Sequence, residues 1–282
     1  MTIVRVGLDL IVCGSCQHPT CMVTGRPELG RTTFPALVGR ISHPTRGAVL
    51  FDTGYGEALR TATDPVARLY RRVLPYRLAP GEACVHQLAA AGIAAGDVHA
   101  IVLSHLHPDH AGGLTDFPAT KVYLSRQAFD ARAPAGFGAR LRAGLIRDLF
   151  PADLGARADF FEDAPHATVT TRDEAFAEGA DIFGDRSVLA VPLPGHAPGH
   201  FGIRIETHGG REVFLAADAA WLSLCYRERL EPLAAARAFI DDYAAYRQTL
   251  AQLQRFAQQR PDVLVVPSHC FTAIEDTRRE LA

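Results

Sequence analysis

Residues 104–113 read SHLHPDHAGG and place three histidines and one aspartate within six residues, directly after the apolar run VHAIVL. Side chains two residues apart in an extended segment point the same way, so His105 and His107 can bind one ion together. Asp109 and His110 follow on the first turn of a short helix and can face a second ion. Zinc and similar divalent ions accept imidazole and carboxylate ligands. This stretch therefore predicts a metal site at a strand end.

The alternative is that these residues bind no metal and have separate structural roles. A single histidine is more often a surface or core residue than a ligand, and Asp109 after a proline could simply cap a helix. Four such side chains at one strand end are hard to explain in that way. The small residues 111–113 that follow would let the backbone pass close beneath the site.

A cluster of this size cannot complete two metal sites, so distant partners are expected at other strand ends. His196 in LPGHAPGH, Asp218 after EVFLAA and His269 after DVLVVPS each follow an apolar run, which would deliver them to a common rim. Asp52 ends AVLFD in the same manner and begins a sharp Asp-Thr-Gly turn. Its expected role is to hold a ligand or a loop by hydrogen bonds.

The rest of the chain alternates short β-branched runs with helical stretches. The expected strands, many of them apolar almost throughout as in sheets covered on both faces, are residues 3–12, 47–52, 100–104, 120–125, 187–193, 202–207, 212–218 and 262–268. The expected helices are residues 232–260, with Pro232 in the first turn, and residues 82–92, which end at Gly92. Residues 1–282 are predicted to form one domain with sheets inside and helices outside.

Two segments, residues 55–81 and 133–157, interrupt this alternation. Both mix Leu and Phe or Tyr with Arg, and both are bounded by proline and glycine. They are interpreted either as covers over the site, as long functional loops often are, or as amphipathic helices packed on the sheet.

Composition excludes several classes of function. The 29 basic and 31 acidic residues nearly cancel and form no long run, which argues against nucleic-acid binding. No apolar run reaches the roughly 18 residues of a membrane span, and the N-terminal residues lack a signal-peptide pattern. We therefore expect a cytoplasmic protein with reduced cysteines and a small-molecule substrate. The sequence does not decide the oligomeric state, and it is compatible with a homodimer.

Taken together, HLHPDH, FDTG, PGHAPGH, the aspartate after an apolar run and the late PSH resemble the metallo-β-lactamase superfamily. The matches occur in family order from Asp52 to His269. The resemblance implies an αββα sandwich, with two mixed β-sheets flanked by helices and two divalent metals at one edge. By position, one metal would bind His105, His107 and His196, the other would bind Asp109, His110 and His269, and Asp218 would bridge them. Zinc is the expected metal, although manganese, iron and cobalt share these ligands.

Three positions indicate which branch of the superfamily the chain resembles. The diiron redox branch usually carries Glu at the position of His107, so the chain resembles the hydrolytic branch. PGHAPGH and the later aspartate are similar to N-acyl homoserine lactonases, in which a Tyr near the substrate carbonyl follows the bridging aspartate by three residues. Here that position is Trp221, whose indole can only donate, and it is the candidate for substrate contact. His200 is interpreted as a structural hydrogen-bonding residue.

The resemblance also implies a mechanism. Two divalent ions about 3.5–4 Å apart share a water and lower its pKa toward neutrality. The hydroxide that bridges them would open a lactone or related ester, with N-acyl homoserine lactones as the leading substrates. Asp109 and Asp218 are the catalytic candidates, Asp109 to orient the water. A glyoxalase-II-like thioesterase, a phosphodiesterase, a diiron redox protein and a metal-free binding protein remain alternatives.

A separate feature is CGSCQHPTC near the N-terminus. Cys13, Cys16, His18 and Cys21 have the close spacing of a zinc or redox site. The second Cys pair of a zinc ribbon is absent, so a turn with incidental thiols is the favoured interpretation.

Overall fold

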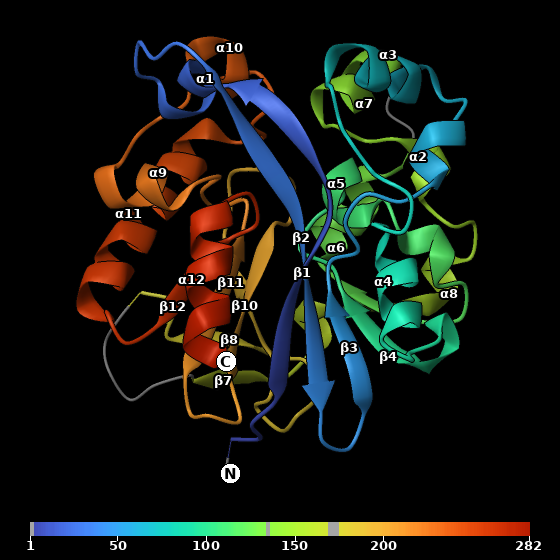
Figure 1. Cartoon of the computed structure of the whole chain (residues 1–282), viewed down its shortest axis with the longest axis vertical. Helices are drawn as coiled ribbons and strands as arrows, with labels where there is room; N and C mark the ends of the chain where they lie inside the picture. The colour runs from blue at the N-terminus through green and yellow to red at the C-terminus, as the bar shows by residue number, and fades with distance from the viewer. Residues whose placement is uncertain (1–2, 134–135, 169–174) are drawn as a thin grey trace.

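The computed structural model describes residues 3–133, 136–168 and 175–282. Its strands form two six-stranded sheets, and helices flank them on both outer sides (Figure 1). One buried apolar cluster joins the sheets, with Val49 and Val102 from one sheet and Ile203 and Leu215 from the other. Both sheets are mixed, so the predicted sandwich of two mixed sheets flanked by helices is confirmed.

The first sheet has the strand order β1–β2–β3–β4–β5–β6. Its strands are β1 (Gly7–Pro19), β2 (Arg31–His43), β3 (Gly47–Phe51), β4 (Val98–Val102), β5 (Lys121–Leu124) and β6 (Ala158–Phe160). The pairs β1–β2 and β2–β3 are antiparallel, whereas β3 to β6 run parallel. The carboxyl ends of β3 and β4 therefore lie at the same edge of the sheet.

The second sheet has the order β12–β11–β10–β9–β8–β7. Its strands are β7 (His166–Thr168), β8 (Glu178–Asp181), β9 (Leu189–Pro192), β10 (Phe201–Glu206), β11 (Glu212–Ala217) and β12 (Leu264–Pro267). Only the β11–β12 pair is parallel among the pairings described in this sheet. These two strands consequently also end at one edge.

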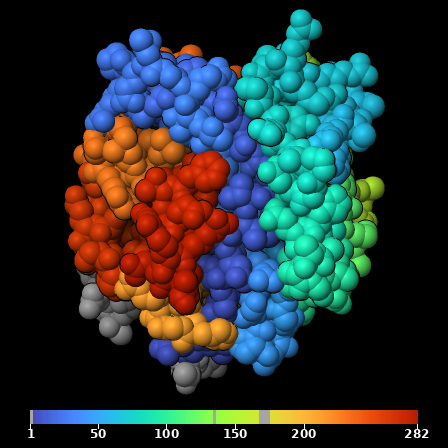
Figure 2. Space-filling view, in the orientation of Figure 1, coloured from blue at the N-terminus to red at the C-terminus, as the bar shows by residue number. Residues whose placement is uncertain are grey.

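The helices fall into two groups on the outer faces. The described α-helices are α1 (Thr20–Thr24), α2 (Ala58–Thr61), α3 (Pro65–Val73), α4 (Cys84–Ala90), α5 (Pro108–Ala111), α6 (Arg126–Ala131), α7 (Phe137–Arg142), α8 (Leu154–Arg157), α9 (Ser223–Glu228), α10 (Ala234–Arg237), α11 (Tyr243–Gln259) and α12 (Phe271–Leu281). Figure 2 shows the N-terminal strands in blue between the red C-terminal helix and the cyan segment that follows β3. In the described part of the chain, no helix is long and apolar enough to cross a membrane.

Several predicted boundaries were wrong. The first strand begins at Gly7 rather than at residue 3 and continues to Pro19, and β2 was not predicted at all. The expected helix over residues 232–260 is two helices, α10 and α11. The break between them is stabilised by tertiary contacts, because the N–H groups of Asp241 and Asp242 donate to the carbonyls of His196 and Gly195. The Asp242 side chain then accepts from the N–H of Ala245 and caps α11.

The two segments that interrupt the strand pattern pack against each other. Residues 55–81 carry α2 and α3, and residues 133–157 carry α7 and α8, with residues 134 and 135 outside the described part. The buried Asp64 carboxylate caps α3 through the N–H of Val66 and forms an ion pair with Arg140 of α7. Asp148 accepts from the N–H groups of Thr63 and Asp64. We call residues 55–81 and 136–157 together the α3–α7 unit.

We predict that Asp64→Ala separates the α3–α7 unit. The substitution removes a helix cap and leaves the Arg140 guanidinium buried without its partner, so the free energy of unfolding should fall by about 3 kcal/mol. Urea denaturation measures this change. Asp163→Ala, which breaks the exposed Arg126–Asp163 pair, is the control and should cost less than about 0.5 kcal/mol. Equal costs for the two substitutions would contradict a structural role for Asp64.

Candidate metal centre

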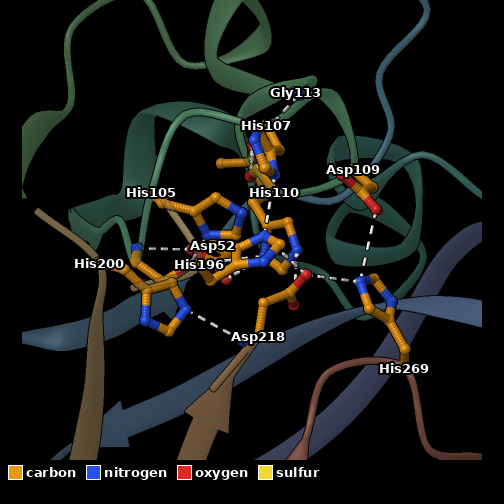
Figure 3. A network of polar contacts seen from close by, with 12 residues as sticks. Asp52, His105, His107, Asp109, His110, Gly113, His196, His200, Asp218 and His269 are labelled. Atoms are coloured by element: carbon orange, nitrogen blue, oxygen red, sulfur yellow. Dashed lines mark hydrogen bonds and ion pairs between the residues drawn. The ribbon is translucent and has the colours of Figure 1, made fainter. Parts of the chain in front are cut away.

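The predicted site residues lie close together (Figure 3), beyond the ends of β3, β4, β9, β11 and β12. Asp52 directly follows β3, and His105 is the third residue after β4 ends at Val102. His196 lies beyond β9, Asp218 directly follows β11, and His269 lies beyond β12. Because the two sheets face each other, strand ends from both deliver side chains to one place.

Two turns at this edge have unusual backbone conformations. Asp52 has φ 63° and Ala217 has φ 45°, both in the left-handed region that residues other than glycine seldom adopt. Each turn redirects the chain at the end of its strand, so that the carboxylates of Asp52 and Asp218 point into the cluster. Strained backbone of this kind is often found at functional sites.

Seven side chains form two groups whose candidate ligand atoms lie within 4.8 Å of one another inside each group. The groups are His105, His107, His196 and Asp218, and Asp109, His110 and His269. The Asp218 carboxylate also contacts the second group, since its oxygens lie 3.2 Å from His110 Nε2 and 3.1 Å from His269 Nε2. The structure therefore brings together every residue that the resemblance assigned to two metals.

A buried layer of hydrogen bonds orients two imidazoles. Asp52 is fully buried and accepts from the Ser104 N–H at 2.7 Å and from the Ser104 hydroxyl at 2.8 Å. The His110 Nδ1–H donates to the same carboxylate at 2.7 Å. Since the Ser104 hydroxyl proton goes to Asp52, its oxygen accepts from His105 Nδ1 at 2.9 Å. These contacts engage the Nδ1 atoms of His105 and His110 and leave Nε2 of both rings directed into the cluster, where it could bind a metal ion.

Backbone carbonyls hold two further rings. His269 Nδ1 donates to the Pro35 carbonyl of β2 at 2.7 Å, which leaves its Nε2 toward Asp218. The His107 ring donates to the Ala143 carbonyl and directs Nδ1 toward His196 Nε2, 3.0 Å away. Gly144 lies against this ring, because a Cβ there would be 2.7 Å from the His107 Cδ2 atom.

The two remaining candidates, His200 and Trp221, both contact Asp218. His200 Nδ1 donates to the Leu193 carbonyl at 2.8 Å, and its Nε2 accepts from the Asp218 N–H at 3.0 Å. Trp221 Nε1 donates to Asp218 Oδ2 at 3.2 Å. His200 is thus a hydrogen-bonding residue beside the cluster, and the Trp221 indole N–H, expected to face a substrate, is directed at a carboxylate.

Burial controls the charge of the cluster. It lowers the pKa of His105 and His196 well below the usual value, so both rings are neutral near pH 7. Burial also opposes charge on His110, yet the carboxylates of Asp218, Asp52 and Asp109 raise the pKa of this ring. For Asp218 burial opposes ionisation, but His269, His110 and His196 hold its pKa well below the usual range. The carboxylates of Asp218 and Asp109 likewise raise the pKa of His269 against its burial, so a cation bound here would replace the protons that these carboxylates favour on His110 and His269.

Unpartnered polar atoms test whether divalent ions fit here. His105 Nε2 and His196 Nδ1 are buried and make no hydrogen bond within the described residues, and His110 Nε2 and Asp218 Oδ1 are buried with only their 3.2 Å contact to each other. Leaving such groups without partners is costly, and a cation among them would satisfy several at once. The donor set of five imidazoles and two carboxylates matches the preferences of zinc.

The N-terminal cysteine motif does not form a metal group among the described residues. Cys13 makes its thiol contact with Cys84 rather than with Cys16, and Gln87 donates to the Cys13 sulfur. Burial raises the pKa of the Cys16 thiol to about 12. All six cysteines are free.

Sequence reasoning missed two aromatic neighbours of the site. Phe34 of β2 contacts the His269 ring edge-on, with centroids 6.0 Å apart, and His18 of β1 contacts Phe34 in turn. Tyr55 is fully buried, its hydroxyl lies 2.9 Å from that of Tyr70, and burial, Tyr70 and the Asp109 carboxylate raise the pKa of this hydroxyl. Phe34 could have been found only by predicting β2, whereas Tyr55 directly follows the Asp-Thr-Gly turn at Asp52.

Comparison with known proteins agrees with this geometry. The family model described as "Metallo-beta-lactamase superfamily" matches residues 32–269, a range that holds all seven clustered side chains. The chain belongs to the metallo-beta-lactamase superfamily. The αββα sandwich and its metal-binding edge are therefore those of a known family of folds.

Curated relatives in this superfamily include lactonases. The N-acyl homoserine lactonase AttM of Rhizobium radiobacter is 28% identical over 81% of this chain and 79% of its own length. The AttM protein of Azorhizobium caulinodans is 34% identical over 68% of this chain and 67% of its own. The probable metallo-hydrolase Rv2300c of Mycobacterium tuberculosis is 33% identical over 61% of this chain and 53% of its own.

Solved structures share the fold at low sequence identity. An N-acyl homoserine lactone hydrolase with the product N-hexanoyl-L-homoserine at its catalytic metal centre has a TM-score of 0.72 and 18% identity, covering 98% of this chain and 97% of its own. A dizinc quorum-quenching lactonase in complex with a product has a TM-score of 0.65 and 16% identity, covering 96% and 90%.

We predict that Gly144→Ala displaces the His107 ring. Gly144 has φ 65°, and a new Cβ would lie 2.7 Å from the ring, so the substitution adds a steric clash to the backbone cost. Gly92→Ala is the matched control, because Gly92 has φ 77° and no atom within 4 Å of its Cβ position. The control should lose about 1 kcal/mol of unfolding free energy, and Gly144→Ala about 1–3 kcal/mol more. A crystal structure with an unmoved His107 would refute the prediction.

Proposed function

We propose that this protein is a two-metal hydrolase that opens lactones, with N-acyl homoserine lactones as its substrates. The observation that carries the proposal is the pair of adjacent ligand groups with Asp218 in contact with both. The relatives named N-acyl homoserine lactonase support the choice of substrate class. The six free cysteines support a cytoplasmic location.

The proposed ligand sets follow the two groups. His105, His107 and His196 would hold one ion, Asp109, His110 and His269 would hold the other, and Asp218 would be shared. Zinc is the proposed ion for both positions. Two such ions, when bound, supply a water of lowered pKa and polarise the carbonyl that it attacks.

A side chain of the protein would then transfer the proton from the attacking water to the leaving oxygen. Asp109 is suited to this task, because its side chain is 15% exposed whereas that of Asp218 is 3% exposed. An oxygen of Asp109 would accept the proton of the attacking water as the water oxygen bonds to the lactone carbonyl carbon. The same carboxylate would give that proton to the ring oxygen when the carbon–oxygen bond breaks. The product is the hydroxy acid, so the atoms of lactone and water are conserved.

The α3–α7 unit is proposed to cover the site and contact the acyl chain of the substrate. Leu141 and Ile146 of this unit belong to the same apolar cluster as Tyr55 and Trp221. That cluster approaches the metal site through Trp221, whose ring contacts His196 with centroids 6.0 Å apart. An apolar acyl tail would bury its methylene groups against these side chains.

A phosphodiesterase activity has less support from the arginines of residues 55–81. Arg71 donates to the backbone carbonyls of Leu59 and Ala62, and Arg60 donates to that of Leu78. Guanidinium groups engaged in this way hold the segment together. Of Arg71, Arg72 and Arg77, the arginines that could serve a phosphate pocket, Arg71 is therefore already engaged.

The activity is tested with zinc-loaded protein on a panel of lactones, thioesters, phosphodiesters and a nitrophenyl ester. We expect lactone hydrolysis that a chelator abolishes, and His107→Ala should lower kcat/KM at least about 100-fold because a ligand is lost. His99→Ala, an exposed position at the other end of β4, is the control. Full activity in His107→Ala would disprove the mechanism, and two irons with oxygen consumption would indicate a redox protein.

The enzyme's preference for long or short acyl chains tests whether the α3–α7 unit contacts the acyl chain of the substrate. Leu141→Ala should lower kcat/KM for a ten-carbon acyl chain about tenfold by removing apolar contact area, and should leave a four-carbon chain nearly unchanged. Val73→Ala, on the same unit but 62% exposed, is the control. An equal loss for both chain lengths would show that Leu141 acts on the site rather than on the acyl tail.

A further inference from the structure

Trp221 lies between the metal cluster and the apolar core. It is half-buried, its ring meets His196 edge-on, and its centroid is 6.5 Å from that of Tyr246 on α11. Its Nε1 is 3.2 Å from Asp218 Oδ2. Contacts on two sides of the indole restrict its rotation and keep the N–H directed at the carboxylate.

Three nitrogen atoms surround Asp218 Oδ2, and they differ in what they can do. His196 Nε2 is 3.2 Å away and His269 Nε2 is 3.1 Å away, and both are imidazole nitrogens that can turn a lone pair to a cation. The indole nitrogen has no available lone pair and can only donate. When cations occupy the two groups, Trp221 is the neighbour of this oxygen that continues to donate a hydrogen bond.

The backbone of Asp218 is already fixed by other contacts. Its N–H donates to His200, the following Ala219 N–H donates to the Ala216 carbonyl, and Ala217 holds the left-handed conformation before it. The freedom that remains is rotation of the carboxylate about its side-chain bonds. A single donor at Oδ2 is sufficient to select one orientation.

We propose that Trp221 is a positioning residue whose indole N–H fixes the Asp218 carboxylate in the orientation that both metal ions require. This inference rests on the proposed function, because it concerns the shared ligand of that site. It assigns Trp221 a role toward the metals instead of the contact with a substrate carbonyl expected from the sequence. Losing the N–H should weaken metal retention and slow turnover without weakening substrate binding.

The chain has one tryptophan, so replacing tryptophan throughout the protein changes residue 221 alone. Incorporation of 3-benzothienylalanine exchanges the N–H for sulfur with nearly the same ring shape. Incorporation of 5-fluorotryptophan by the same procedure keeps the N–H and is the matched control. Zinc affinity is measured by competition with a chromophoric chelator, and kcat and KM are measured for a lactone. Circular dichroism establishes that both proteins fold.

We expect the benzothienyl protein to bind zinc about 10- to 100-fold more weakly than the fluorotryptophan protein, as losses of groups that orient metal ligands typically do. At saturating zinc its kcat should fall while its KM stays within about twofold. Equal zinc affinity in the two proteins would overturn the proposal, and a raised KM with unchanged affinity would assign Trp221 to the substrate. The zinc competition decides this even if the wild type hydrolyses no lactone, an outcome that would refute only the proposed function.

Discussion

The structure depends on the contact of one buried carboxylate with three imidazoles. Asp218 is 2% exposed, and an ionised carboxylate at that depth is costly unless positive or polar groups surround it. His110, His196 and His269 supply these groups from three different strand ends. The two sheets must face each other with their strand ends in register, because otherwise the charge would be buried without partners. Burying the Asp218 carboxylate costs free energy unless polar groups surround it. The imidazoles that meet this requirement also make the edge suited to cations.

A second constraint is that each imidazole must present an unprotonated nitrogen. A free histidine has two tautomers, and the partner of one ring nitrogen selects between them. Asp52 acts on His110, the Ser104 hydroxyl acts on His105, and the Pro35 carbonyl acts on His269. These partners come from β2, from the end of β3 and from the residue before the motif. Residues in and after the strands of the first sheet thus stabilise the fold, and they also orient the imidazoles of the cluster.

The sequence predicted which side chains cluster better than it predicted the residues that hold them in place. His105 to His110 and the residues after three distant apolar runs could be found because strand ends carry a local pattern. β2 was missed, and with it Phe34 and Pro35, whose contacts with His269 cross more than two hundred residues. The break before α11 also has no strong local signal, since it depends on carbonyls of residues 195 and 196. Contacts between distant segments decided each of these features.

The arrangement separates the proposed metal ligands from the side chains that surround them. The clustered side chains are set by strand ends and their hydrogen bonds, whereas Trp221 and the α3–α7 unit belong to connections between elements. A substitution in a connection can change the surroundings of the Asp218 carboxylate or of an acyl chain without moving a strand. Trp221 illustrates this, because the indole reaches the shared carboxylate from a loop while contributing no ligand. Under the proposed function, substitutions in these connections would therefore alter substrate choice while the clustered side chains keep their places.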